Sequence, residues 1–500
     1  MSFFSTRGGA CVTASQAILR GLAPDGGLYV PAMFPPVTPK QIASLAGMSY
    51  QQRAVAILKL YLEDFSLPEL ENAVSQAYAP DKFDDPAIAP VRRLDDNTAV
   101  MELFHGPTLA FKDMALQLLP HLTTLSARKN GEEREVSILV ATSGDTGKAA
   151  LEGFKDVPGT SCTVFYPTDG VSDVQKLQMT TTGGSNTHVI GLNGNFDDAQ
   201  TGVKQLFSSE AFAQSVGSRG KVLSSANSIN FGRLATQIVY YFSAYADLLA
   251  QGKIRNGDPV NFVVPTGNFG NILAGIYARW MGLPVKRFIC CSNRNRILDD
   301  FLRTGVYDVR REFYRTTSPS MDILISSNLE RLLFEMSGRD AERVRGWMER
   351  LMREGMYSVD DGTRQRMDAL LSSGWADDAA VADEIRRTWN ERGYLMDTHT
   401  AVAMRVLREY RERTCDRTPC VVVSTASPFK FSADVLRALT GAAPDDAFAC
   451  ADELERICGG SMPRALRELK TLPVLHTGVV EPAGMEQAVL DAVTKNSEKK

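Results

Sequence analysis

The sequence predicts an α/β protein with more than one domain. The chain has 500 residues, which is too many for one ordinary hydrophobic core. From about Val100 to Ser427, short β-branched runs alternate with helical stretches. These runs are almost continuously apolar, which is typical of parallel strands that helices cover on both faces.

Six apolar, β-branched runs of this region are expected to be strands: Val136–Ala141, Cys162–Tyr166, His188–Leu192, Val260–Val264, Arg287–Cys291 and Cys420–Thr425. Helices are expected between them, at Ala149–Phe154, Ala199–Phe207, Arg233–Leu249 and Ile272–Met281. Residues 1–95 precede this pattern and are predicted to be mostly helical, with one helix at Tyr50–Leu67. Residues 328–415 are rich in Arg, Glu, Leu and Met at helical spacing, which predicts a solvated helical insertion.

Composition excludes several classes of function. The apolar fraction is 44%, the charged fraction 23% and the net charge −4, so no basic field indicates nucleic acid or an anionic membrane as a partner. The eight cysteines and five histidines have no zinc-site or disulfide spacing, so we expect no metal and reduced thiols. A long uncharged run, Pro259–Ala278, contains Pro265 and several glycines, which is wrong for a membrane span. We therefore expect a cytoplasmic protein.

The stretch Phe104–Ala115, FHGPTLAFKDMA, places a lysine among apolar neighbours. A turn at His105–Thr108 is expected to lead into a helix from Asp113 that ends at Pro120. Lys112 would then project from the first turn of that helix. Partial burial lowers the pKa of an amine and favours the neutral nucleophile that Schiff-base chemistry needs. Taken alone, the stretch is better explained as a solvated surface lysine.

Two further segments follow apolar runs and precede helices. Val263–Asn271, VVPTGNFGN, predicts a strand, a glycine-asparagine turn and a helix start, which is the geometry of an anion site. Ala141–Lys148, ATSGDTGK, has hydroxyls at Ser143 and Thr146 that could hold a carboxylate or a second phosphate. A Walker A loop is excluded there, because Ala149 stands where Ser or Thr is required. Each turn could also be a plain connection.

A fourth segment, Val421–Phe431, ends a buried run with hydroxyl side chains. Such a hydroxyl could hydrogen-bond a heteroaromatic nitrogen, or it could be an ordinary turn residue. A lysine for an imine, a turn for a phosphate and a hydroxyl for a ring nitrogen are together the parts of a pyridoxal 5′-phosphate site.

With these parts in place, the chain resembles the threonine synthase family, in its longer, fungal- and proteobacterial-like branch. The resemblance covers nearly the full length. It is carried by eight ordered motifs: STRG (5–8), GLAPDGGLYVP (21–31), HGPTLAFKD (105–113), ATSGDTG (141–147), NSINFGR (227–233), PTGNFGN (265–271), DTHTA (397–401) and STASPFKF (424–431). The chain departs from the family pattern at Asn271, where aspartate is common, and at Thr398, where proline usually stands.

The resemblance implies the tryptophan-synthase-β-like arrangement of fold type II. Residues 1–95 would form an N-terminal extension, 96–440 a catalytic core of two open α/β lobes with the helical insertion at about 328–415, and 441–500 a C-terminal segment. The cofactor would be pyridoxal 5′-phosphate between the lobes, held covalently by Lys112. Its phosphate would bind Gly267, Asn268, Phe269 and Asn271, and its ring nitrogen would face Thr425.

The implied reaction converts O-phospho-L-homoserine and water to L-threonine and phosphate. Ser143, Asp145 and Thr146 are candidates for the carboxylate and amine end of the substrate. Asn230 and Arg233 are candidates for its phosphate, although Arg233 could instead form a structural ion pair at a helix start. Two alternatives remain, a phospho-lyase that releases a keto acid and an inactive binding protein on the same fold. The presence of Lys112 disfavours the inactive binding protein. A related β-replacement enzyme, such as a cysteine or tryptophan synthase, would not be expected to carry the long N-terminal motif. We expect a monomer or homodimer that acts on a small molecule.

Overall fold

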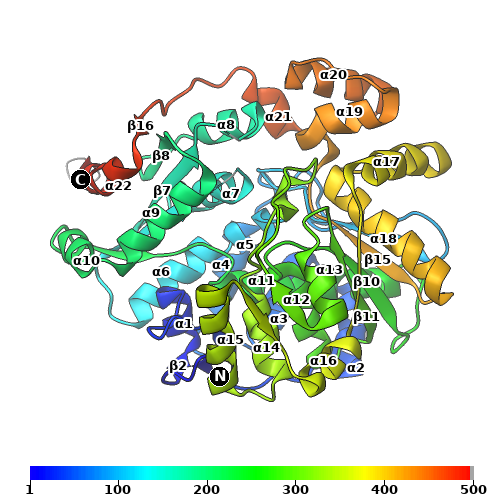
Figure 1. Cartoon of the computed structure of the whole chain (residues 1–500), viewed down its shortest axis with the longest axis horizontal. Helices are drawn as coiled ribbons and strands as arrows, with labels where there is room; N and C mark the ends of the chain where they lie inside the picture. Colours follow the sequence, from blue (N-terminus) through cyan, green and yellow to red (C-terminus); the bar gives the residue numbers. More distant parts are fainter. Residues whose placement is uncertain (143, 170, 496–500) are drawn as a thin grey trace.

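Two largely parallel sheets form two lobes at opposite ends of the molecule (Figure 1). The computed structural model describes residues 1–142, 144–169 and 171–495. The larger sheet has six strands in the order β14-β11-β10-β15-β5-β4, and the smaller sheet has five in the order β16-β8-β7-β6-β9. Within these two sheets only β4 runs antiparallel to its neighbour. The predicted α/β class with two open lobes is confirmed.

The strands of the larger sheet are β4 (Val91–Arg93), β5 (Thr98–Glu102), β10 (Val260–Pro265), β11 (Val285–Ser292), β14 (Leu371–Trp375) and β15 (Cys420–Ser424). Those of the smaller sheet are β6 (Glu135–Ala141), β7 (Thr160–Pro167), β8 (Thr187–Leu192), β9 (Lys221–Ser224) and β16 (Val479–Val480). The central strands β10 and β15 are buried along their whole length, because helices cover both faces of the larger sheet.

Helices of the opening region are α1 (Ala14–Arg20), α2 (Pro39–Ser44), α3 (Tyr50–Leu58) and α4 (Leu67–Ala77). Those around the smaller sheet are α5 (Asp113–Leu116), α6 (Leu119–Lys129), α7 (Asp145–Phe154), α8 (Asp173–Thr180), α9 (Phe196–Ser208), α10 (Glu210–Gly217) and α22 (Met485–Lys495). The larger lobe contains α11 (Phe231–Ala250), α12 (Gly270–Trp280), α13 (Ile297–Thr304), α14 (Leu329–Met336), α15 (Ala341–Glu354), α16 (Asp361–Asp368), α17 (Asp378–Arg392) and α18 (Thr398–Thr414). The C-terminal segment adds α19 (Ser432–Thr440), α20 (Ala447–Cys458) and α21 (Arg464–Leu469).

The opening region differs from the prediction in two ways. It contains a three-stranded antiparallel sheet, β2-β1-β3, built from β1 (Ser2–Ser5), β2 (Val12–Thr13) and β3 (Tyr29–Pro31). The single helix expected over Tyr50–Leu67 is also wrong, because α3 ends at Leu58. A new helix, α4, starts after Ser66, where Glu69 completes a capping box and a proline occupies the first turn.

The helix after Lys112 is likewise shorter than predicted. It ends at Leu116, and α6 begins at Leu119 with Pro120 in its first turn. Proline has no N–H to donate, so it is tolerated where the helix has no acceptor to offer. Pro120 therefore starts a helix instead of ending one.

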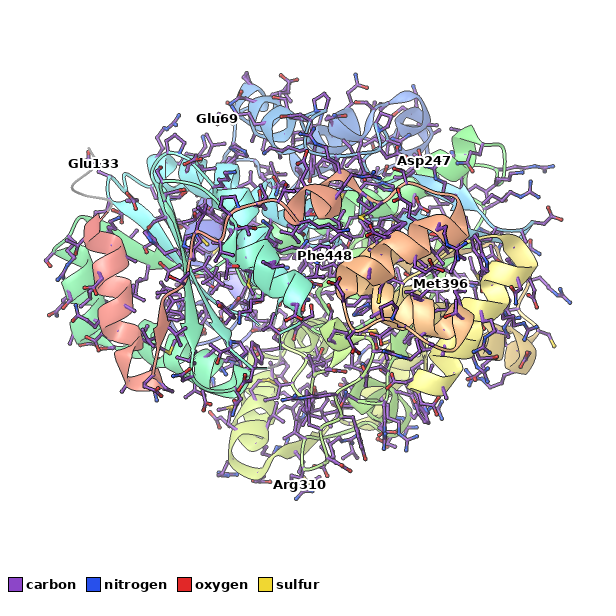
Figure 2. All side chains as sticks on the ribbon, turned by 90° about the horizontal axis from the view of Figure 1, so that it is seen from above. Glu69, Glu133, Asp247, Arg310, Met396 and Phe448 are labelled. Atoms are coloured by element: carbon purple, nitrogen blue, oxygen red, sulfur yellow. The ribbon has the colours of Figure 1, made fainter. Side chains whose placement is uncertain are left out.

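Residues 328–415 contain five helices, α14 to α18, and also two strands. The expected solvated insertion is wrong for α18, which is largely buried and packs against the larger sheet. One is β14, the edge strand of the larger sheet, and the other is β13 (Met356–Ser358), which pairs with β12 (Val306–Asp308). Seen from above, charged side chains such as Glu133 and Arg310 lie at the rim, whereas Met396 is buried (Figure 2). None of the helices in the described ranges combines the length and apolarity that a membrane crossing needs.

Candidate active site

Lys112 lies where the two lobes meet. It directly precedes α5, and its neighbour Phe111 donates a backbone hydrogen bond to the carbonyl of Thr425, at the end of β15, at 2.8 Å. Its Nζ lies 3.3 Å from Oδ2 of Asp145, the first residue of α7 on the smaller lobe. The lysine side chain is only 11% exposed. Lys112 therefore lies between the carboxyl end of β15 in the larger sheet and the segment that follows β6 in the smaller one.

The turn before Lys112 is fixed by buried polar contacts. Asp113 accepts hydrogen bonds from the backbone N–H of Thr108 at 2.8 Å and from its hydroxyl at 2.7 Å. Lys430 donates to the carbonyl of Thr108 at 2.8 Å. Leu109 adopts a positive φ of 59°, a conformation that costs energy for a branched side chain and persists only where the surroundings enforce it. The lysine is thus presented from a rigid turn.

Asp145 is the centre of the polar network. Its Oδ1 accepts from Nζ of Lys430 at 2.8 Å and from Nε2 of Gln175 at 2.8 Å. Its Oδ2 faces Lys112 and accepts from the hydroxyl of Ser320 at 3.0 Å. Four side chains from four parts of the chain therefore converge on one buried carboxylate.

Burial and charge set the protonation states of this pair. Burial lowers the pKa of Lys112; the carboxylate of Asp145 opposes this, while the charges of Lys430 and Arg233 add to it. Burial alone would raise the pKa of Asp145, but Lys430 and Lys112 outweigh it and hold that pKa well below its usual range. The arrangement combines a permanent carboxylate with an amine that loses its proton more readily than a surface lysine.

The loop between β10 and α12 has the features of an anion site. The backbone N–H groups of Gly267 to Asn271 have no acceptor among the described residues, and they lie at the N-terminus of α12. A Cβ added to Gly267 would stand 2.8 Å from the carbonyl oxygen of Ser320, so only glycine fits there. Phe269 caps the helix with a positive φ of 60°. The carbonyl of Asn268 is held by the backbone and side chain of Asn328, at 3.1 and 3.0 Å.

Asn271 is buried at the start of this helix. Its Oδ1 accepts from the hydroxyls of Tyr240 and Tyr241 at 2.7 and 2.8 Å. Its Nδ2 has no partner within the described ranges. A buried donor without an acceptor is costly unless a ligand satisfies it, so this amide fits a bound anion.

Arg233 is a buried cation without a counter-ion. It lies in the first turn of α11, is 3% exposed, and its Nη1 donates to the carbonyl of Ala226 at 3.0 Å. No carboxylate in the part of the chain that the structure describes pairs with it, and its Nε has no partner there. Burial lowers its pKa to about 10. The structural ion pair considered from the sequence is absent from the described residues.

Asn230 caps α11. Its Oδ1 accepts from the N–H of Gly232 at 2.9 Å, and its Nδ2 donates to the carbonyls of Ile18 and Ser225 at 2.9 and 3.1 Å. Its side chain is therefore occupied by backbone groups, and a role in binding substrate phosphate remains a prediction.

The remaining predicted residues lie around Lys112. Thr425 is 6% exposed, and its hydroxyl has no hydrogen bond to another described residue. Thr146 is half-buried in the first turn of α7, beside Asp145. Ser143 lies outside the described residues. Lys112, Asp145, Arg233 and Thr425 are thus gathered at one place, and Ser320 links the Gly267 loop to them.

Sequence reasoning gave no role to several residues of the network. Lys430 lies in the STASPFKF motif, six residues after the end of β15. This position could have indicated a site residue, because the motif follows a strand end at the site. Ser320 had no signal, because it lies in a single 3₁₀ turn, Pro319–Met321, far along the chain from the other site residues. Its N–H donates to Nε2 of His399 at 3.1 Å, and Nδ1 of His399 lies 2.7 Å from Oδ2 of Asp397. This buried His–Asp pair holds the Ser320 loop against the site.

Three family models match the chain, namely "Threonine synthase N terminus" at residues 2–78, "Pyridoxal-phosphate dependent enzyme" at 90–360 and "Threonine synthase, C-terminal" at 400–473. The threonine synthase of Pseudomonas aeruginosa is 41% identical over 458 residues, covering 91% of this chain and 94% of that protein. The chain belongs to the threonine synthase family.

Solved structures agree with this assignment. The pyridoxal-phosphate-bound threonine synthase from Brucella melitensis has a TM-score of 0.87 and 38% identity, covering 99% of both chains. Yeast threonine synthase has a TM-score of 0.88 and 32% identity, covering 100% of this chain and 99% of that one. Threonine synthase-like 1 of Homo sapiens is 41% identical over 435 residues, which is 85% of this chain but 58% of that protein. The chain thus spans little more than half the length of that relative.

Proposed function

We propose that the protein is a pyridoxal-phosphate-dependent enzyme that converts O-phospho-L-homoserine and water to L-threonine and phosphate. One observation carries the proposal. Two anion-binding features, the free amides of the Gly267 loop and the unpaired guanidinium of Arg233, accompany the buried Lys112. The amides of the Gly267 loop suit the phosphate of the cofactor, and the guanidinium of Arg233 suits the phosphate of the substrate.

The residues that would hold the cofactor are those of the loop and the two strand ends. Lys112 would bind it covalently, the backbone of Gly267, Asn268 and Phe269 with the amide of Asn271 would bind its phosphate, and Thr425 would face its ring nitrogen. When bound, the cofactor withdraws electrons from the substrate's Cα, which makes the neighbouring C–H bonds acidic. A hydroxyl partner leaves a ring nitrogen uncharged more readily than a carboxylate does.

Lys112 is the group placed to move protons. With the cofactor in place, the Nζ of Lys112 would be the base that takes the proton from Cα, and its lowered pKa favours the neutral amine that this role needs. Loss of a proton at Cβ would let the γ-phosphate leave, and a proton returned to Cγ with water added at Cβ would then give the methyl and hydroxyl groups of threonine. Arg233 holds the phosphate throughout, and its buried charge stabilises the leaving anion.

Asp145 and Thr146 are proposed to receive the amino-acid end of the substrate, together with Ser143. The permanent negative charge of Asp145 suits the amine and repels the carboxylate. The hydroxyl of Thr146 is therefore assigned to the carboxylate.

The experiment is product analysis with the purified holoenzyme and O-phospho-L-homoserine. We expect threonine and phosphate in equal amounts. Phosphate with a keto acid and no threonine would replace the proposal by the phospho-lyase alternative. Binding without any turnover would replace it by the inactive binding protein.

We also infer a reducing, cytoplasmic setting and a monomer or homodimer. The inference on compartment rests on the eight cysteines, all of which carry free thiols, two of them exposed. Non-reducing electrophoresis of protein alkylated in freshly lysed cells tests it, because eight labelled thiols are expected.

A further inference from the structure

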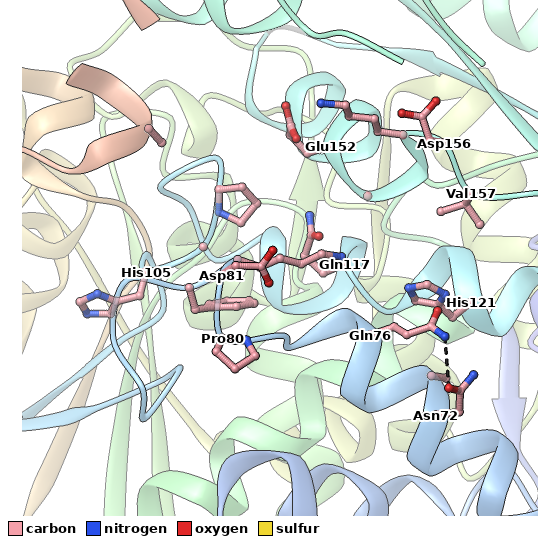
Figure 3. Close-up of a pocket in the computed structure, with 18 of the residues that line it drawn as sticks. Asn72, Gln76, Pro80, Asp81, His105, Gln117, His121, Glu152, Asp156 and Val157 are labelled. Carbon is pink, nitrogen blue, oxygen red and sulfur yellow. Dashed lines mark hydrogen bonds between the residues drawn. The ribbon is translucent and has the colours of Figure 1, made fainter. Parts of the chain in front are cut away.

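A second cavity lies behind the turn that carries Lys112 (Figure 3). Its volume is about 1180 Å³, and its walls come from α4, α6, the end of α7, the loop around Lys82 and the start of α21. Gly106, Pro107, Leu109 and Gln117 line it, whereas Lys112 and Asp145 do not. The cavity is therefore separate from the active site but shares the segment that positions the lysine.

Gln117 lines this cavity and carries an unsatisfied donor. The side chain is 1% exposed, and its Nε2 has no hydrogen-bond partner within the described ranges. In the view of Figure 3 it lies between Asp81 and Glu152, in the middle of the lining residues. A buried amide N–H₂ without an acceptor indicates a place for one.

Apart from Arg464, which pairs with Glu468, the lysine and arginine residues that line the cavity form no ion pair with a described residue. Lys82 is half-buried and forms no ion pair with a described residue, and burial lowers its pKa. Burial, with the nearby charge of Lys82, lowers the pKa of His121 to about 4, so its ring is neutral at pH 7 and can donate one N–H. Arg128 and Lys155 lie at the exposed rim, also outside any ion pair of the described residues.

The acidic residues of the lining are mostly engaged elsewhere. Ion pairs hold four of them: Glu69 with Lys129, Asp84 with His105, Glu152 with Lys148 and Glu468 with Arg464. Asp156 accepts from the backbone and hydroxyl of Ser185, at 2.8 and 3.1 Å. Only the exposed Asp81 remains, so the uncommitted groups of the cavity are mainly cations and N–H donors.

Part of the remaining wall is apolar, with Phe83, Pro107, Leu125 and Pro158, and part is uncharged polar, with Asn72, Gln76 and Thr124. A pocket of this kind takes a ligand with an apolar body and a few polar anchors. We propose that this cavity is a second ligand site, which binds a small organic anion, a carboxylate or a phosphate ester, through Lys82, His121 and Gln117.

An occupant of this site would act on the short helix that begins after Lys112. The N–H of Gln117 donates to the carbonyl of Asp113 at 3.0 Å, and Asp113 holds the turn through Thr108. Gln117 directly follows α5, and Lys112 directly precedes it. A ligand bound to the Gln117 side chain would therefore act on the opposite end of the helix from Lys112.

The test is calorimetric titration of the holoenzyme with benzoate and with phenyl phosphate, beside benzyl alcohol as the neutral analogue. We expect saturable binding of at least one anion, and about tenfold weaker binding of the alcohol, since a hydrogen bond to a charged group contributes about that factor. Lys82→Met and Gln117→Leu should each weaken anion binding by about tenfold. Lys59→Met, an exposed lysine outside the cavity, is the matched control and should bind like the wild type.

The active site offers a competing explanation that the same titration separates. If Lys82→Met binds both anions like the wild type while Arg233→Met does not, the anions enter the active site and the proposal is overturned. Absence of saturable binding by either anion also overturns it. Lys82 is half-buried, so its replacement is expected to fold, and thermal unfolding of each variant checks this. The titration measures binding and not turnover, so its result tests the second ligand site independently of the proposed catalytic function.

Discussion

Replacing Arg233 by methionine is the sharpest test of the substrate. Met keeps the length and apolar stem of the side chain and removes the charge. A hydrogen bond to a charged group contributes about 1.5–3 kcal/mol, so kcat/KM for O-phospho-L-homoserine should fall about tenfold to a hundredfold. Folding stability should change little, because among the described residues the guanidinium of Arg233 makes one hydrogen bond, to the carbonyl of Ala226, and no ion pair. Steady-state kinetics and thermal unfolding of the same preparations measure both.

Arg53→Met is the matched control, because Arg53 is also a buried arginine but has partners. It pairs with Asp247 at 2.6 Å and donates to the hydroxyl of Ser243 at 2.8 Å. Its loss should destabilise the fold by about 1–3 kcal/mol, the cost of partners left unsatisfied, and leave kcat/KM near the wild-type value at temperatures where the variant is folded. If Arg233→Met instead lowers stability and keeps kcat/KM, its charge serves the fold and the assignment to substrate phosphate is wrong.

Four further predictions use other residues. Lys112→Ala should lower kcat by orders of magnitude and abolish the visible absorbance of the bound cofactor; near-normal turnover would refute its role. Gly267→Ala should weaken cofactor affinity in a titration of the apoprotein, because its Cβ would meet a carbonyl at 2.8 Å, whereas Gly346→Ala, in open space, should not. Thr425→Asp should impair turnover and shift the cofactor spectrum, since a carboxylate favours a protonated ring nitrogen; an unshifted spectrum would contradict it. Burial alone lowers the pKa of His105, but its two carboxylate partners raise it from 6.5 to about 9, so its stabilising contribution is full below pH 6.5 and is lost as pH rises through 9. The difference in unfolding free energy between wild type and His105→Gln should shrink over that range; a constant difference would exclude the linkage.

The elements that the sequence predicted well are those whose pattern is local and strong. The run at Val260–Val264 became β10, one residue longer, because four of its five residues are apolar and helices cover both faces. The edge strand β14, with the sequence LSSGW, has no such apolar pattern. It could not be predicted locally, because its pairing to β11 is set by tertiary packing. The short strands β1 and β3 were missed for the same reason, because they pair across more than twenty intervening residues.

The site was predictable where one residue or one motif carries the chemistry. Lys112 and the Gly267 loop belong to strand-turn-helix connections that can be recognised locally. The hydrogen bond from Ser320 to Asp145 joins residues 175 positions apart, and nothing near Ser320 in the sequence indicates it. The orphaned amide of Asn271 could not be foreseen either, since it depends on the two tyrosines that occupy its oxygen.

The charges around Asp145 explain how one site can hold a carboxylate beside an amine whose pKa is lowered. If Lys112 were its only partner, the attraction would keep the amine protonated, which opposes its use as a base. Lys430 supplies a second cation, 2.8 Å from the other carboxylate oxygen and fully buried. The charge of Lys430 balances that of Asp145. The same charge also lowers the pKa of Lys112, because it disfavours a second positive charge nearby. The same two contacts of Lys430, to Asp145 and to the carbonyl of Thr108, fix the carboxylate and the lysine turn relative to each other. Lys430 therefore serves position and protonation at once.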